Sequence, residues 1–308
     1  MTLSVILPNY NHASLLKKAL EAIITQSYPP DEIVLIDDGS TDNSLDVIAS
    51  FQKRFPNLRL IQNEKNLGPV PTINRGVKEA RGELLAFCSA DDFILPGFFE
   101  KGVSVMQQHP ELALCCGKAA HFEAQTPKVL IPDQMPDLGK ELRLLLPKET
   151  AALFRNTTFF IHTNCTIYRK KPLFEYGGLN PKLKSLCDWY LSCQIALHHP
   201  IAYLPSLMAA FRLDEASYSK STKRASNNDE MFHALMEQIL SEGSEWKHAV
   251  ASTGMLSHAG IQMVLFLMRE KKYRKFFPKA FLKKCQFHYH HLFRRGDPLK
   301  AGDLDNIS

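Results

Sequence analysis

The chain has 308 residues, 45% of which are hydrophobic, and a formal net charge of +5. This length and composition support a large folded core and exclude a disordered chain. The seven cysteines are an odd number without a Cys-x-x-Cys pair, so we expect reduced, packed thiols rather than disulfides or a zinc site. The first residues lack the pattern of a secretory signal, and we therefore expect a cytoplasmic protein.

The first 117 residues alternate between expected strands and helices. Short apolar runs bounded by turn residues predict strands over residues 3–7, 32–36, 58–61, 83–88 and 112–116. Apolar residues at helical spacing lie between these runs, and prolines or glycines end the helices. Repeated βα units of this kind predict an α/β fold with a mainly parallel sheet and right-handed crossovers.

The pattern weakens from residue 118 to 160, where four prolines interrupt it. Beyond it we expect a strand at 165–168, a helix at 187–198, and strands at 201–204 and 208–211. Residues 214–228 are polar and predict a mobile loop, and everything after residue 229 is expected to be helical. The predicted division is a catalytic-type α/β domain over residues 1–228 and a helical, basic C-terminal extension over residues 229–308.

The positive charge is concentrated in this extension. Residues 269–296 hold ten Lys or Arg side chains, interleaved with aromatic residues, against the single acid Glu270. This composition fits an anionic membrane surface, a nucleic acid, or a plain solvated helix. The preceding stretch, residues 249–268, has about the length of a membrane-spanning helix. Because His258 and Gln262 interrupt it, we expect a packed helix instead.

Two acidic pairs are the most informative feature of the sequence. Asp37 and Asp38 follow one expected strand, and Asp91 and Asp92 follow another. In open α/β sheets ligands bind outside the carboxyl ends of the strands. Carboxylates at that edge indicate a site for a nucleotide and a divalent metal.

Five segments, in order, carry a resemblance to a known family. They are VILPNYN at 5–11, VLIDDGSTD at 34–42, NLG at 66–68 with Asn74 and Gly76 after it, SADD at 89–92, and PG at 96–97. Together they resemble family 2 glycosyltransferases of the GT-A fold, over roughly residues 2–215. The resemblance implies a Rossmann-like, mainly parallel sheet flanked by helices. It also implies an inverting transfer of sugar from a nucleoside diphosphate donor, with UDP favoured, to a hydroxyl of a polysaccharide or lipid-linked glycan.

The resemblance also assigns the donor-binding residues. Asp37 would accept the N–H of the base, while Asp38 shapes the turn beneath it, and Arg212 would reach the diphosphate. The full expected nucleotide-binding set is Pro8, Tyr10, Asn11, Asp37, Asp38, Asn74, Asp91 and Arg212. The alternative for the first segment is structural, with Pro8 ending a strand and Asn11 capping a helix.

A divalent metal, Mn²⁺ or Mg²⁺, is expected at the second acidic pair. By resemblance Asp92 is the direct ligand, and Asp91 lies near the ribose and the metal. Many family members have Asp where this chain has Ser89. The alternative is that the pair only caps the following helix.

Asp188 is the expected general base, because it occupies the place of the family's acidic motif at the start of a helix. Cys187 replaces the first acid of that motif, so Asp188 would act alone. Without the resemblance, a cap on the helix N-terminus would be the better interpretation. Asp214 stands where the family often has His, and Lys220, Lys223 and Arg224 are expected in a lid over the donor.

Two functions from different classes therefore remain. The first is the transferase, acting at the inner face of the cell membrane as a peripheral protein. For the segment 269–296 the family's use of lipid-linked acceptors favours the anionic membrane over nucleic acid, which we do not expect as a partner. The second function is a catalytically degenerate subunit that binds nucleotide sugar without turnover, an alternative supported by Ser89, Cys187 and Asp214.

Overall fold

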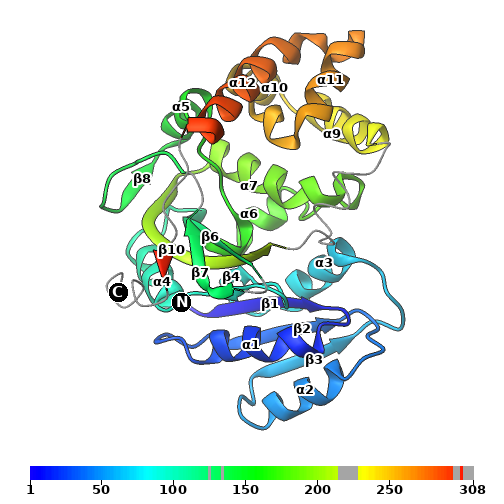
Figure 1. The fold of residues 1–308 in the computed structure, drawn as a ribbon, viewed down its shortest axis with the longest axis vertical. Helices are drawn as coiled ribbons and strands as arrows, with labels where there is room; N and C mark the ends of the chain where they lie inside the picture. Colours follow the sequence, from blue (N-terminus) through cyan, green and yellow to red (C-terminus); the bar gives the residue numbers. More distant parts are fainter. Residues whose placement is uncertain (124–125, 133–134, 214–227, 294–298, 301–308) are drawn as a thin grey trace.

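A parallel block of four strands forms the first half of the sheet. The computed structural model describes residues 1–123, 126–132, 135–213, 228–293 and 299–300 (Figure 1). The four strands are β1 (Leu3–Asn9), β2 (Glu32–Asp37), β3 (Leu58–Gln62) and β4 (Leu84–Phe87). They lie in the order β3-β2-β1-β4, so that Asn9 pairs with Asp37 at the carboxyl ends of β1 and β2. The two acidic pairs therefore lie at the carboxyl ends of β2 and β4, the two strands that flank β1.

The second half of the sheet is mixed. Its strands are β5 (Phe93–Ile94), β6 (Leu114–Glu123), β7 (Thr126–Pro132), β8 (Arg143–Leu145), β9 (Thr166–Arg169) and β10 (Ile201–Leu213). Strand β9 is antiparallel to both β4 and β6, whereas β10 is parallel to β6. The predicted α/β fold with a GT-A-like sheet is confirmed, and the expected strands at 201–204 and 208–211 are one strand. Pro205 lies where the register of that strand shifts, because proline cannot donate to the ladder.

Helices cover both faces of the parallel block. They are α1 (Ala13–Ile24), α2 (Ser44–Gln52), α3 (Pro69–Glu79) and α4 (Phe98–Gln108). Alternation along β1 sends Val5 and Leu7 toward α1, α2 and α4, and sends Ile6 toward α3. Helix α3 lies very close to the sheet, since a Cβ on Gly76 would come within 2.5 Å of Ile36 Cδ1. Glycine is therefore required there.

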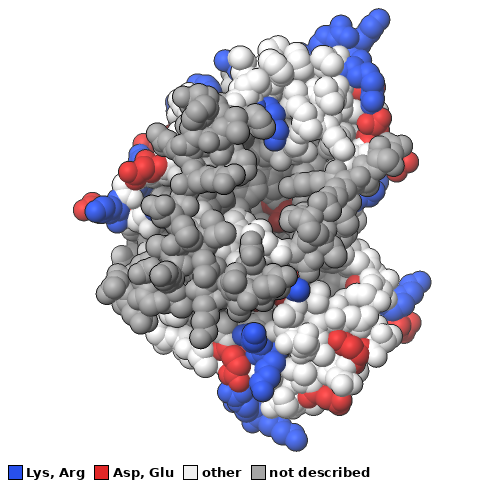
Figure 2. Space-filling view, viewed as in Figure 1, with Lys and Arg blue, Asp and Glu red and all other residues white. Residues whose placement is uncertain are grey.

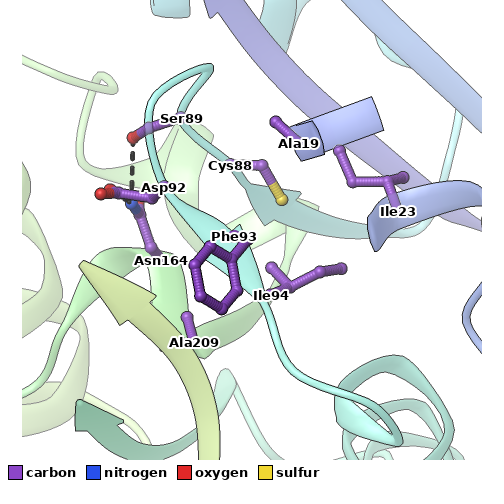
Figure 3. Close-up of a pocket in the computed structure, with 9 residues that line it drawn as sticks. All are labelled: Ala19, Ile23, Cys88, Ser89, Asp92, Phe93, Ile94, Asn164 and Ala209. Carbon is purple, nitrogen blue, oxygen red and sulfur yellow. Dashed lines mark hydrogen bonds between the residues drawn. The ribbon is translucent and has the colours of Figure 1, made fainter. Parts of the chain in front are cut away.

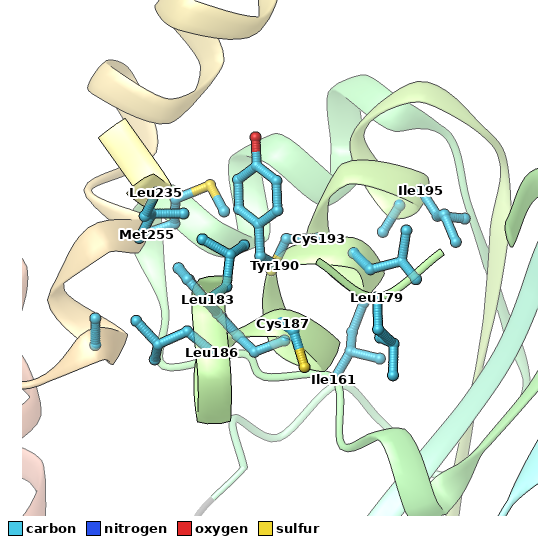
Figure 4. Close-up of a cluster of buried hydrophobic side chains, with 14 of the residues drawn as sticks. Ile161, Leu179, Leu183, Leu186, Cys187, Tyr190, Cys193, Ile195, Leu235 and Met255 are labelled. Carbon is cyan, nitrogen blue, oxygen red and sulfur yellow. The ribbon is translucent and has the colours of Figure 1, made fainter. Parts of the chain in front are cut away.

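A second helical layer stands above the mixed half of the sheet. It begins with α5 (Pro147–Asn156), η1 (Thr163–Cys165), α6 (Lys170–Glu175), η2 (Pro181–Leu186) and α7 (Cys187–His198). The C-terminal extension adds α9 (Asp229–Ser241), α10 (Ser244–Thr253), η3 (Met255–Ala259), α11 (Ile261–Arg269), η4 (Lys271–Phe276) and α12 (Phe277–Phe293). Figure 4 shows Leu235 and Met255 of the extension packed with Leu183, Leu186 and Tyr190. The extension thus shares a hydrophobic core with α7.

The apolar stretch 249–268 is divided rather than continuous. Gly254 and Gly260 both have positive φ and separate α10, η3 and α11. Within the described part of the chain, none of the helices combines the length and apolarity needed to cross a bilayer. The extension also ends differently from our expectation of helix throughout, since β11 (Leu299–Lys300) is a short strand antiparallel to β7.

Candidate functional site

Asp37 lies at the carboxyl end of β2 with its side chain only 1% exposed. Its Oδ2 accepts hydrogen bonds from Asn9 Nδ2 at 2.8 Å and Ser40 Oγ at 2.6 Å, and its Oδ1 accepts the Ser40 amide at 2.9 Å. A carboxylate has about four acceptor positions. Three are used by these donors, which leaves one on Oδ1 for a further N–H.

Asp38 points into the loop that follows β3. Its Oδ1 accepts Asn63 Nδ2 at 2.7 Å and the Leu67 amide at 2.9 Å, and its Oδ2 accepts the Gly68 amide at 2.9 Å. The side chain is 3% exposed. Asp38 therefore holds the loop that leads into α3.

The segment after β1 joins this network. Asn11 has a φ of 53°, its amide donates to Ser40 Oγ at 2.9 Å, and its Oδ1 accepts the Thr41 amide at 2.7 Å. Asn11 thus fixes the loop that carries Ser40. Tyr10 is 40% exposed, and Pro8 is partly exposed within β1.

Asn74 is bound from both sides by one backbone segment. Its Nδ2 donates to the Leu179 carbonyl at 2.7 Å, and its Oδ1 accepts the Leu179 amide at 3.0 Å. The two bonds tie α3 to the turn at Gly177 and Gly178, both of which have positive φ. In this structure Asn74 connects the parallel block to the layer that carries Asp188.

Asp92 is the most heavily bonded member of the second acidic pair. Its Oδ1 accepts the backbone amide of Arg212 at 2.8 Å, and its Oδ2 accepts Asn164 Nδ2 at 2.9 Å. The same Nδ2 donates to Ser89 Oγ at 2.9 Å, so one amide binds both side chains (Figure 3). The backbone of Arg212 thereby fixes β10 to the loop after β4.

Partial burial and a neighbouring negative charge make this carboxylate hard to ionise. Desolvation and the neighbouring charge of Asp91 raise the pKa of Asp92 to about 7, although hydrogen bonds from Arg212, Ser89 and Asn164 oppose the shift. Asp91 and Asp92 are both partly exposed. A cation at this pair would favour the ionised form of both carboxylates.

Asp188 lies in the first turn of α7 and is partly exposed. Its Oδ2 accepts the hydroxyl of Thr163 at 3.1 Å. The adjacent Cys187 is buried, and its burial raises the pKa of the thiol well above the usual range. Cys187 is therefore a packed, neutral side chain, and Asp188 is the only acid in that turn.

Two residues that the sequence analysis missed join the two halves of the site. Thr163 and Asn164 are consecutive in η1, and each donates to one carboxylate, Asp188 and Asp92 respectively. They lie just after residues 118–160, the segment whose local pattern was too weak to interpret. A polar Thr-Asn pair just before the strand at 166–169 was the only local signal.

Figure 2 shows a hollow between the sheet half and the helical half, with acidic atoms at its floor. Among the described residues no group of three or more His, Cys, Asp or Glu side chains could hold a metal alone. A Mg²⁺ or Mn²⁺ ion commonly uses one or two carboxylates together with substrate phosphates. The Asp91–Asp92 pair fits that kind of site. Of the expected loop 214–228, residues 214–227 lie outside the described residues, and these include Asp214, Lys220, Lys223 and Arg224.

Comparison with known proteins assigns the family. The model for glycosyl transferase family 2 matches residues 4–177, which is more than half of the chain. An uncharacterized glycosyltransferase from Nostoc sp. is 40% identical over 234 residues, covering 75% of this chain and 70% of the relative. This chain belongs to glycosyl transferase family 2. The chain spans only 58% of the length of uncharacterized Mycobacterium tuberculosis and Mycobacterium bovis relatives, which it matches at 30% identity.

Solved structures agree on the fold. Residues 1–349 of Staphylococcus aureus TarS, in complex with UDP-GlcNAc, superpose with a TM-score of 0.68 at 20% identity, covering 93% of this chain and 81% of that one. The mannosyltransferase PcManGT from Pyrobaculum calidifontis, in complex with GDP-Man and Mn²⁺, gives a TM-score of 0.56 at 17% identity. It covers 94% of this chain and 87% of that one. At these identities the likeness concerns the fold alone.

Proposed function

We propose that the chain is an inverting, metal-dependent glycosyltransferase that moves a sugar from a UDP-sugar to a hydroxyl of a polysaccharide or lipid-linked glycan. One observation carries the proposal. The carboxylates of Asp92 and Asp188 are held by the consecutive residues Asn164 and Thr163, at the carboxyl edge of the parallel strands. Family membership supports it, as do the nucleotide sugars named with TarS and PcManGT.

The donor base is assigned to the pocket at Asp37. The remaining acceptor position on its Oδ1 suits an N–H of the base, and the exposed ring of Tyr10 offers a face for stacking. Ser40, Asn11 and Asp38 keep this pocket in shape through the bonds described above. Uracil offers one such N–H between two carbonyl groups, which favours a UDP donor.

The diphosphate is assigned to the second acidic pair and Arg212. Asp92 and Asp91 would hold the metal ion, and the side chain of Arg212 would contact phosphate oxygens. When bound, the ion supplies Lewis-acid stabilisation of the charge that develops on the departing diphosphate. Asn164 and Ser89 keep Asp92 directed toward that position.

The proton transfer is assigned to Asp188. Its ionised carboxylate accepts the proton of the acceptor hydroxyl as that oxygen bonds to the anomeric carbon. The bond from that carbon to the diphosphate oxygen breaks on the opposite face, and UDP leaves with the bonding electron pair. The configuration at the anomeric carbon is therefore inverted. Thr163 holds the carboxylate in place for this step.

Location follows from the basic extension. We propose that residues 269–296 meet an anionic membrane surface at the inner face of the cell membrane, where lipid-linked acceptors are present. Exposed cations at Lys271, Lys272, Arg274 and Lys275 support this assignment.

Ligand-induced thermal stabilisation tests the donor assignment. The protein is heated with UDP-, GDP- and TDP-sugars, each with and without Mn²⁺. A UDP-sugar with Mn²⁺ is expected to raise the Tm by several degrees, because a ligand of the folded state stabilises it by mass action. Asp92→Asn should remove the Mn²⁺-dependent part of the shift, while the exposed Asp46→Asn should keep it. The proposal fails if none of the nucleotide sugars stabilises the wild type.

A further inference from the structure

The outer side of α11 carries three large apolar side chains in one row. Ile261, Leu265 and Met268 are 52%, 51% and 48% exposed, at spacings of four and three residues. This spacing places them on one face of the helix. The opposite face is fully packed, with Met263, Val264, Phe266 and Leu267 at most 2% exposed. Helix α11 is thus apolar on both sides. We call the exposed residues Ile261, Leu265 and Met268 the α11 outer row.

Cations adjoin this row directly along the chain. In η4 the aromatic residues Tyr273 and Phe276 are 1% exposed. The four basic residues between and before them are exposed, namely Lys271, Lys272, Arg274 and Lys275. Two of these cations cover the rings, with Lys272 Nζ 5.3 Å and Lys275 Nζ 5.2 Å from the ring centroids. No carboxylate of the described chain forms an ion pair with any of the four.

We propose that α11 and η4 form a docking surface for an anionic lipid membrane, with the α11 outer row among the acyl chains and the η4 cations on the headgroups. An apolar row bordered by unpaired cations matches both the apolar and the anionic layer of such a surface. A helix of nine residues is about 13 Å long, far shorter than a bilayer core of about 30 Å, so it would lie in the membrane plane. Figure 2 shows Lys and Arg side chains projecting at the end of the molecule where Figure 1 places α11.

The position of this surface relates it to the acceptor side of the site. Directly before α11, His258 of η3 contacts Phe160 with ring centroids 5.3 Å apart, and contacts Trp189 at 6.1 Å. Trp189 is the neighbour of Asp188 in α7. The donor half, with β1, β2 and β3, lies at the other end of the molecule (Figure 1). Docking through α11 would bring the side of the site that carries Asp188, the proposed general base, toward the membrane. A lipid-linked acceptor would be presented there.

Co-sedimentation with vesicles tests the proposal without any donor sugar, so its outcome is independent of the proposed transfer. The probes are vesicles of phosphatidylcholine alone and vesicles with about a third phosphatidylglycerol. Wild type should sediment with the anionic vesicles and stay in the supernatant with the neutral ones. Two combined variants should bind the anionic vesicles at least about tenfold more weakly. One is the triple variant Ile261→Gln/Leu265→Gln/Met268→Gln, and the other is the double variant Lys271→Glu/Lys272→Glu.

Matched controls address general effects of apolarity and charge. One control removes three other exposed apolar side chains and is the triple variant Leu142→Gln/Leu144→Gln/Leu146→Gln. The other reverses the charge of two exposed lysines of α1 and is the double variant Lys17→Glu/Lys18→Glu. Both controls should bind like wild type, and all variants should keep the wild-type Tm within a few degrees. The proposal is overturned if wild type does not prefer anionic vesicles, or if the α11 variant binds them as wild type does. It is equally overturned if the α11 variant only changes the oligomeric mass in analytical ultracentrifugation, because the row would then join copies of the chain.

Discussion

The side-chain nitrogen Nδ2 of Asn164 lies 2.9 Å from Oδ2 of Asp92, and this hydrogen bond links residues 72 positions apart in the chain. The preceding residue, Thr163, makes the corresponding bond to Asp188. One short 3-10 turn thus positions both the carboxylate that we assign to the metal and the diphosphate, Asp92, and the carboxylate that we assign to proton transfer, Asp188. A shift of that turn would move both carboxylates together.

Separate substitutions in this turn should have separable effects. Asn164→Ala removes a donor from the partly buried carboxylate of Asp92 and should weaken Mn²⁺-dependent UDP binding about tenfold, as the loss of such a bond costs about 1–3 kcal/mol. Thr163→Val removes the donor to Asp188, so we expect unchanged UDP binding and a several-fold lower kcat. Calorimetric titration with UDP and Mn²⁺, together with steady-state turnover, measures both. Equal effects of the two variants on binding would contradict the separate roles.

Asp38 is expected to matter for stability. Asp38→Ala would remove the acceptor of the Leu67 amide, and it would leave Asn63 Nδ2 with Thr72 Oγ1 alone and the Gly68 amide with Asn66 Oδ1 alone. We expect a loss of about 2–4 kcal/mol in the free energy of unfolding, measured by urea titration. The exposed Asp46→Ala serves as the control and should change it by less than about 0.5 kcal/mol. A similar small change for Asp38→Ala would show that the loop holds its shape without this carboxylate.

Glu32 should make part of the stability depend on pH. Burial would raise the pKa of Glu32, but bonds from Ser4, the Arg81 amide and Arg59 outweigh it and lower the pKa below the usual 4.5. Its contribution is therefore complete above about pH 4.5 and disappears as the pH falls through the lowered pKa. Glu32→Gln should destabilise the protein by about 1–3 kcal/mol at pH 7, and the difference from wild type should shrink in acid.

Urea titrations at neutral and acidic pH measure this difference. Glu79→Gln is the control, since Glu79 is about half exposed and only reaches Arg59 at 3.4 Å. It should have little effect at either pH. If Glu32→Gln lowers the free energy of unfolding by the same amount in acid as at pH 7, the ionisation of Glu32 is not linked to stability.

The parallel half of the fold was predictable because its information is local. Each strand of the block is a short apolar run, and burial on both faces selects such runs. The placement of Asp37 at the end of β2 and of Asp92 after β4 followed from that pattern alone. The split between Asp37, with an acceptor position left on Oδ1, and Asp38, with its bonds turned into the protein, was less visible in sequence. Both are aspartates in one turn, and only the fold shows which donors each one meets.

The connections across the site depended on tertiary packing. Asn74 was expected at the nucleotide, and its assignment there remains a prediction, but the structure shows both polar atoms of its side chain bound to Leu179, 105 positions away. Thr163 and Asn164 lie next to a segment without clear periodicity. The α11 outer row was hidden as well, since the sequence shows an apolar stretch but not which of its faces α9, α12, η3 and η4 cover.

The central claim is that Asp188 activates the acceptor while the rest of the site binds the donor. The direct measurement is UDP release from the stabilising UDP-sugar in the presence of Mn²⁺, for wild type and Asp188→Asn, with UDP binding measured in parallel. We predict measurable turnover by wild type, about a thousandfold lower kcat for the variant, and equal UDP affinity. Turnover by Asp188→Asn at the wild-type rate would contradict the assigned base, and donor binding without any turnover by wild type would identify a degenerate binding subunit.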